Sequence, residues 1–133
     1  MIFKHSSKGF SLPELLIVAA ILGYSLSVVL LTFINGNALN ESSRNLITSI
    51  AHAEYVMEDI KNTAFSSLAT NLANGDWTWN NAAVASHGLT PMNSESITTT
   101  YTGSNPLDIT VTVNWNDTRG RSRAKTLRTL ISG

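Results

Sequence analysis

The chain has 133 residues, no cysteine and a formal net charge of zero, with nine basic and nine acidic side chains. The absence of cysteine excludes a disulfide framework and any thiolate-ligated metal site. Once a long apolar stretch near the N-terminus is set aside, the remaining chain suffices for one small domain.

A short polar leader precedes this apolar stretch. The leader covers residues 1–9 and carries two lysines, Lys4 and Lys8. The apolar run, residues 15–34, contains no charged side chain and can cross the roughly 30 Å hydrocarbon core of a bilayer as one helix. A secretory signal peptide fits less well, because its apolar core is only about 7–15 residues long and is followed by a small-residue cleavage site.

A single carboxylate, Glu14, stands at the upstream edge of the apolar run, where a plain anchor would carry a lysine or an apolar residue. A charged group at the centre of a bilayer costs roughly 2.5–3.5 kcal/mol or more. The residues leave two explanations open. Either an ammonium group pairs with Glu14, or Glu14 stays at the level of the lipid headgroups.

The segment GFSLPE, residues 9–14, and the apolar residues behind it resemble the N-terminus of type IV pilins and type II secretion pseudopilins. The resemblance rests on a glycine, then an aromatic residue, then a carboxylate at the fifth position after the glycine. It implies that a prepilin peptidase recognises Lys8 and Gly9, cuts after Gly9 and N-methylates Phe10. It also implies that Glu14 pairs with the terminal amine of a neighbouring subunit during assembly.

Pro13 lies where a helix tolerates proline. The first four N–H groups of a helix have no internal acceptor, so a proline at the fourth position of the cleaved chain removes no hydrogen bond. Before cleavage its ring opposes a helix through Gly9, which predicts a non-helical scissile region. Many members of the family carry an aliphatic residue here, and this departure leaves the motif intact.

The distribution of positive charge predicts the orientation in the membrane. Both leader lysines precede the apolar run, and no positive charge follows it until Arg44. The leader is therefore expected in the cytoplasm, and the C-terminal domain is expected to be periplasmic or extracellular. The resemblance implies a single-pass protein of the inner membrane that later enters a pilus or pseudopilus.

A long helix is predicted in two halves, a transmembrane half over residues 10–36 and an amphipathic half over residues 38–69. Between the halves, residues 35–37 form a weak point because asparagine and glycine disfavour helix. Apolar residues recur at steps of three and four in the second half, which predicts a stripe packed on a sheet. The stripe consists of Leu39, Leu46, Ile50, Ala53, Met57, Ile60, Ala64 and Leu68.

Turn-forming residues dominate the predicted loop over residues 70–96, which has room for one short turn of helix or strand. Trp77 and Trp79 within it are predicted to cover the edge of the helix or sheet. A surface for a partner subunit is the alternative for these two indoles.

Three strands are predicted within residues 97–132, and β-branched residues dominate the first of them. The second strand alternates strictly, with Ile109, Val111, Val113 and Trp115 on one face. The predicted fold class is α+β, of the type IV pilin kind: a long helix packed on a small antiparallel β-meander. The extracytoplasmic domain is expected to span residues 37–133.

No catalytic or metal-ligating constellation is evident in the sequence. The three histidines are scattered, no serine has a positioned base, and no glycine-rich loop fits a phosphate. A calcium site from Asp76, Asp108 and Asp117 would have a spacing unlike a dedicated calcium loop. We therefore expect no enzymatic activity and no cofactor.

Basic residues cluster near the C-terminus, namely Arg119, Arg121, Arg123, Lys125 and Arg128. A solvated face or a charge contact between subunits is favoured for this cluster. DNA binding, which would use such cations on phosphates, is the less favoured alternative.

The expected function is that of a minor pilin or minor pseudopilin. The short length and the lack of cysteine favour a minor subunit, and residues 111–131 weakly resemble the C-terminal hairpin of minor pilins and small tip pseudopilins. The implied partners are the prepilin peptidase and methyltransferase, other pilin or pseudopilin subunits, and lipid of the inner membrane. The alternative is a membrane-anchored extracytoplasmic module that binds DNA or another ligand and joins no filament.

Overall fold

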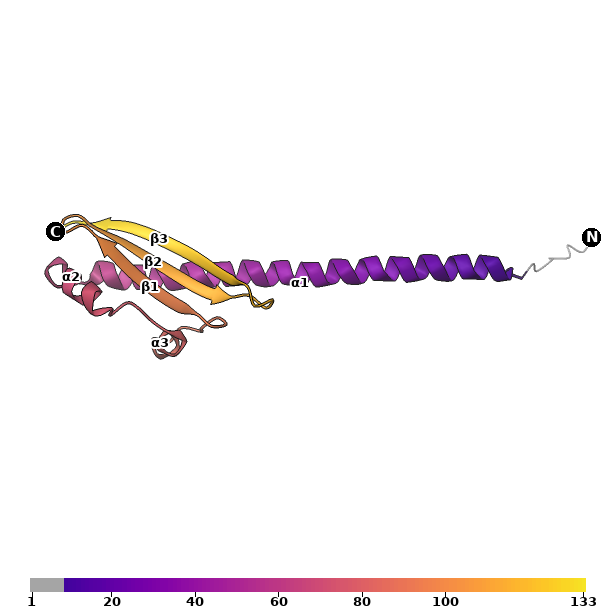
Figure 1. The fold of residues 1–133 in the computed structure, drawn as a ribbon, viewed down its shortest axis with the longest axis horizontal. Coiled ribbons are helices and arrows are strands. Elements are labelled where there is room, and N and C mark those ends of the chain that lie inside the picture. Colours follow the sequence, from indigo (N-terminus) through magenta and orange to yellow (C-terminus); the bar gives the residue numbers. More distant parts are fainter. Residues whose placement is uncertain (1–8) are drawn as a thin grey trace, which may run out of the picture. The chain divides into compact units, whose positions relative to one another are not determined.

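The computed structural model describes residues 9–133, so the lysines of the leader lie outside the described residues. Helices come first, α1 (Leu12–Asn62), α2 (Phe65–Asn74) and α3 (Asn81–Ser86), followed by strands β1 (Ser96–Thr102), β2 (Leu107–Asn116) and β3 (Ser122–Ile131) (Figure 1). A long N-terminal helix and an antiparallel three-stranded sheet confirm the predicted α+β class. The chain divides into two compact units, Met1–Leu39 and Asn40–Gly133, and α1 contributes residues to both.

In the first unit, α1 is apolar and none of its residues is buried. Within the described residues, α1 is the helix whose length and composition would allow it to cross a membrane, and none of its most apolar window is buried. Three hydroxyl groups interrupt this surface, and each donates a hydrogen bond to the carbonyl oxygen four residues earlier. The pairs are Ser25 to Ile21 at 2.8 Å, Ser27 to Gly23 at 2.9 Å and Thr32 to Val28 at 2.9 Å. Each of these hydroxyls therefore has an acceptor within its own helix and needs none from solvent or another element.

Helix α1 continues through residues 35–37, the predicted weak point, and ends earlier than expected. The predicted helix over residues 38–69 is broken after Asn62, because Ala64 has the extended backbone angles φ −58° and ψ 131°. The Thr63 amide donates to the Ile60 carbonyl at 3.1 Å, which closes the last turn. The break lets α2 begin at Phe65 as a separate helix, with Leu68 still buried.

The segment predicted as a loop, residues 70–96, contains the end of α2 and all of α3. Helix α2 ends at Gly75, whose φ of 79° lies in the left-handed region and whose amide caps the helix carbonyls. Helix α3 begins after Asn80, whose side chain accepts a hydrogen bond from the Ala83 amide at 2.9 Å.

The sheet has the strand order β1–β2–β3, and both pairings are antiparallel. Alternate residues of β2 are buried, as its sequence predicts. In register, Val113 faces Ile97 of β1, and Val111 faces Leu127 of β3. Leu127 packs against the core, while Leu130, an odd number of residues further along β3, lies on the opposite face and is exposed.

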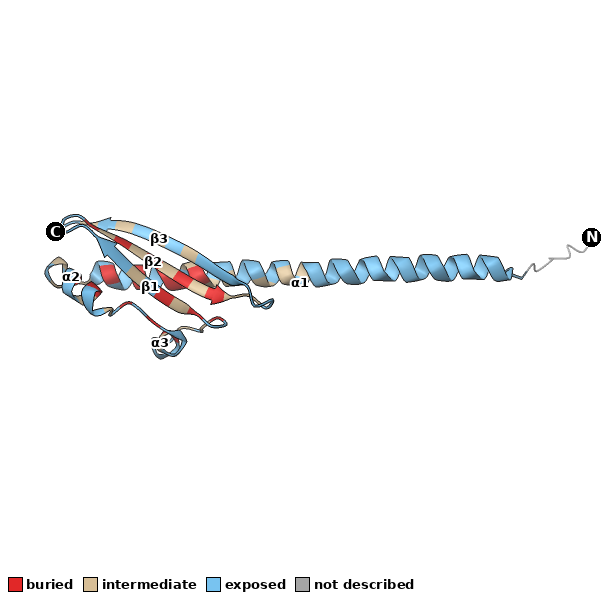
Figure 2. Cartoon of the chain, in the orientation of Figure 1, coloured by how far each residue is buried: buried red, intermediate tan, exposed pale blue. Residues whose placement is uncertain are grey.

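The core of the second unit lies between the sheet and the later turns of α1 (Figure 2). The predicted stripe is confirmed at Ala53, Met57 and Ile60. It is wrong at Ala64, which is exposed, and at Leu39 and Leu46, which are 69% and 43% exposed. The sequence periodicity continues beyond the part of α1 that the sheet covers, and buried residues of α1 begin only at Ser49. The stripe omitted three buried residues of α1, namely Ser49, His52 and Val56.

Candidate functional site

The first candidate site is the junction between the GFSLPE segment and α1. Residues 9–11 are not helical, and the first turn closes with a 3.1 Å hydrogen bond from the Leu15 amide to the Ser11 carbonyl. Pro13 is thus the second residue of α1, where its missing N–H costs no hydrogen bond. This confirms the prediction that Pro13 fits the helix and leaves the preceding backbone non-helical.

Glu14 occupies the first turn of α1 and is exposed. A carboxylate there interacts favourably with the positive end of the helix macrodipole. Within residues 9–133 no cation forms an ion pair with Glu14, and the Phe10 side chain is 75% exposed. Gly9 and Phe10 are accessible, whereas Lys8, predicted to take part in peptidase recognition, lies outside the described residues.

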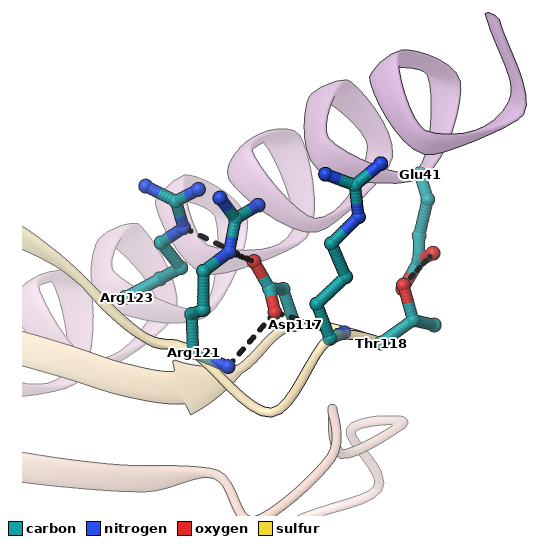
Figure 3. A network of polar contacts seen from close by, with 6 residues as sticks. Glu41, Asp117, Thr118, Arg121 and Arg123 are labelled. Carbon is teal, nitrogen blue, oxygen red and sulfur yellow. Dashed lines mark hydrogen bonds and ion pairs between the residues drawn. The ribbon is translucent and has the colours of Figure 1, made fainter. Parts of the chain in front are cut away.

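The second candidate site is the turn between β2 and β3, where one carboxylate organises the backbone. One oxygen of Asp117, Oδ1, accepts hydrogen bonds from the amides of Arg119 at 3.0 Å and Arg121 at 2.9 Å. The other, Oδ2, contacts the Nε atoms of Arg121 at 2.8 Å and Arg123 at 3.4 Å (Figure 3). Gly120 supplies the positive φ of 72° that the turn requires.

Hydrogen bonds and charge stabilise the ionised form of Asp117. The Arg121 amide is the largest cause that lowers the pKa of Asp117, and the Arg121 guanidinium and the Arg119 amide act in the same direction. Partial burial of the carboxylate opposes this effect. The lowered pKa keeps Asp117 ionised to a lower pH than an ordinary aspartate, which preserves the contacts that hold the turn.

The same turn is attached to α1. The Thr118 hydroxyl donates a 2.7 Å hydrogen bond to Oε2 of Glu41, as Figure 3 shows. Beside this contact lies an open groove of about 480 Å³, bordered by Glu41, Arg44 and Asn45 of α1 and by Asn116 and Thr118 of the turn. Its lining mixes amides, hydroxyls and one ion of each sign.

The structure divides the C-terminal basic cluster that the sequence groups together. Arg119, Arg121 and Arg123 gather around Asp117, and we call these three residues the arginine tip. Arg128 lies further along β3 and forms an ion pair with Asp108 of β2. The hydrogen bond from Arg128 lowers the pKa of Asp108 and raises that of Arg128.

Sequence reasoning missed a buried polar pair in the second unit. The His52 Nδ1 atom lies 2.7 Å from Oε1 of Glu95, and Oε2 of Glu95 accepts a 2.7 Å hydrogen bond from the Met92 amide. His52 is 5% exposed and Glu95 is 2% exposed. This hydrogen-bonded pair holds the segment before β1 against α1. The sequence indicates it only in that His52 directly precedes Ala53, which is predicted to lie on the buried side of the helix.

Both indoles of the predicted loop belong to the core, as the favoured interpretation expected. Trp77 donates a 2.6 Å hydrogen bond from Nε1 to Asp59 of α1. Trp79 forms a β-bridge with Ile97 and stacks on His87 with ring centroids 3.8 Å apart. Each is 5% exposed, which leaves little indole surface for a partner subunit.

Acidic side chains of the second unit do not converge. Among residues 9–133 no group of three His, Cys, Asp or Glu side chains is arranged to hold a metal ion. Asp108 and Asp117 are each engaged by arginine, and Asp76 follows the end of α2. The proposed calcium ligands therefore occupy separate places.

Comparison with protein-family models, with curated proteins and with solved structures finds no match to this chain.

Proposed function

We propose that this chain is a structural subunit, of the minor pilin or minor pseudopilin kind, of a type IV pilus or type II secretion pseudopilus. The observation that carries the proposal is the junction at α1: a non-helical GFS segment leads directly into a helix that bears Glu14 in its first turn and is apolar on its exposed surface. In this proposal the chain is the substrate of a processing enzyme and has no catalytic role of its own.

Processing acts on the exposed residues ahead of α1. A prepilin peptidase recognises Lys8 and Gly9 and cuts after Gly9, and the new terminus at Phe10 is N-methylated. Proteases bind extended backbone, and residues 9–11 are free of helix. Cleavage leaves an amine at Phe10 that is cationic near neutral pH, one helical turn before Glu14.

The apolar side chains in the first half of α1 need a surface that covers them. Among residues 9–39 no other element packs against them, so lipid covers them first and the helices of neighbouring subunits cover them after assembly. Pairing offsets the free-energy cost of holding the Glu14 carboxylate in an apolar environment, and the amine of an adjacent Phe10 provides the opposite charge. This ion pair then sets the axial register between neighbouring helices.

Orientation follows the positive-inside rule. The leader stays in the cytoplasm, α1 crosses the inner membrane once, and the second unit is periplasmic or extracellular.

Mass spectrometry of the full chain, produced together with a prepilin peptidase, tests the processing step. The expected product begins at Phe10 and carries one added methyl group. Gly9→Val should leave the product beginning at Met1. A wild-type chain that still begins at Met1 beside a peptidase that cleaves a reference prepilin would overturn the proposal.

Glu14→Ala tests assembly separately from processing. Cleavage should continue, while recovery of the subunit in sheared filaments should fall by at least about tenfold, as expected for a lost charge pair in a medium of low polarity. Glu54→Ala, which removes an exposed carboxylate from the other part of α1, is the matched control and should assemble normally. Equal incorporation of both variants would instead favour the anchored binding module.

A further inference from the structure

The charges of the second unit are separated between its two ends. At the end where the β2–β3 turn contacts Glu41, four arginines stand against three carboxylates: Arg44 and the arginine tip against Glu41, Asp117 and the buried Glu95. In the remainder of this unit five carboxylates outnumber three cations. The Glu41 end is therefore positive, although the chain as a whole is neutral.

The Glu41 end is also close, along the chain, to the end of the apolar run. Glu41 follows Ile34 by seven residues. Seven residues span at most about 25 Å, even in a fully extended chain. The headgroup layer adds roughly 5–7 Å beyond the hydrocarbon core on each side. Chain length alone thus keeps the tip near the bilayer surface if residues 15–34 occupy the hydrocarbon core.

The arginine tip has unused hydrogen-bonding capacity. Asp117 engages Arg121 and Arg123 through their Nε atoms, and within residues 9–133 their terminal Nη groups donate no hydrogen bond. Their side chains are 56% and 45% exposed, and Arg119 is exposed and uses only its backbone amide. Planar guanidinium groups bind phosphate oxygens in a bidentate manner, and here the carboxylate holds the turn that presents them.

We propose that the arginine tip binds the phosphate groups of anionic phospholipids at the membrane surface and so holds the second unit against the bilayer before assembly. This inference rests on the membrane insertion of α1 in the proposed function. A basic cluster beside a membrane span gains about fivefold in occupancy per arginine near an anionic surface, an effect that decays within a Debye length of about 8 Å. Extraction into a filament would then have to release these contacts.

The test uses the full chain inserted singly into lipid nanodiscs, which excludes contacts between copies. Because the chain has no cysteine, Ser122→Cys beside the tip and Ser104→Cys in the β1–β2 turn each carry one fluorophore. Lipids with spin-labelled headgroups act as quenchers. Replacing part of the phosphatidylcholine with phosphatidylglycerol should increase quenching at position 122 several-fold, high salt should reverse the increase, and position 104 should not respond.

The variant Arg119→Gln/Arg123→Gln retains the contacts between Asp117 and Arg121 that hold the turn. This variant should lower the phosphatidylglycerol-dependent increase in quenching at position 122 by at least about tenfold, because each arginine contributes on the order of fivefold to lipid binding. The matched control Lys61→Gln/Arg128→Gln removes two cations from α1 and β3 away from the tip and should keep the full response. Equal quenching in both lipids, or an unchanged response of the tip variant, would overturn the inference.

Failure of the inference can be told apart from failure of the proposed function. A chain that floats with vesicles in high salt yet shows no lipid dependence at position 122 retains its membrane anchor and loses only the proposed phosphate contact. A chain that does not float in either lipid overturns the anchor itself. Binding of duplex DNA that the tip variant abolishes, without any response to anionic lipid, would assign the tip to nucleic acid and contradict a lipid role.

Discussion

The two compact units use the same residue types in opposite ways. In the first unit Ile21 is 60% exposed, whereas in the second unit Ile60 of the same helix is 0% exposed. The difference lies in the sheet, which covers α1 only from Ser49 onward. Burying a large apolar side chain contributes about 1.5–3 kcal/mol, so the second unit obtains this stabilisation from its own fold. The described residues of the first unit include no buried side chain, so their fold supplies none of this stabilisation.

The largest expected effect comes from one substitution made in both units. Ile60→Ala should lower the free energy of unfolding of the second unit by about 2–5 kcal/mol, because it leaves a cavity in the core. Ile21→Ala should leave that free energy unchanged. Urea denaturation in detergent micelles, followed by tryptophan fluorescence, measures this unit alone, since all three tryptophans lie in it. Similar losses for both variants would contradict the separation into units.

A smaller effect distinguishes how the two units satisfy their polar groups. His52→Ala removes the partner of a buried Glu95 oxygen and should cost about 1–3 kcal/mol in the same assay. Ser25→Ala in the first unit removes a hydroxyl that bonds only to its own helix, and a change within about 0.5 kcal/mol is expected. If Ser25→Ala proved the more damaging variant, the polar groups of the first unit would depend on tertiary contacts.

The smallest effect is the pH dependence that the ion pairs of the second unit produce. Arginine contacts lower the pKa of Asp108 and Asp117 in the folded state. Their stabilisation is therefore complete above the unfolded pKa of about 4 and is lost as the pH falls through the lowered folded values. Asp108→Asn/Asp117→Asn should flatten this acid decline in denaturant midpoints measured from pH 6 downward. An acid decline as steep as that of the wild type would refute the assignment.

A second double variant separates the pairing from general surface charge. Asp108→Asn and Arg128→Gln remove the two partners of one ion pair. Their effects on the acid decline should not add when combined, because each alone already abolishes the contact. Additive effects would mean that the two side chains act independently.

Most of the fold of the second unit could be predicted from local patterns. The alternation in β2 and the turn around Asp117 are encoded by adjacent residues, and both are found in the structure. The length of the helix was harder to predict. The apolar periodicity continues from α1 into α2, because Ile60 before the break and Leu68 after it are both buried. The pattern therefore conceals the extended backbone at Ala64.

The candidate sites also differ in how far the sequence alone could predict them. The GFSLPE segment is contiguous, so its position at the start of α1 followed from sequence alone. The pairing of His52 with Glu95 joins residues 43 positions apart, and neither side chain has a distinctive neighbour in the sequence. The division of the basic cluster was likewise invisible, because Asp108, the partner of Arg128, lies on the adjacent strand.

The hydrogen bonds by which Asp117 holds its turn also have a consequence for proteolysis. A protruding hairpin with three arginines is a natural target for trypsin-like proteases, which must draw the substrate backbone into an extended form. The carboxylate ties down the amides of Arg119 and Arg121, so the chain has to break both hydrogen bonds before it fits such a cleft. One acidic side chain thereby protects an exposed cationic loop from cleavage after its arginines.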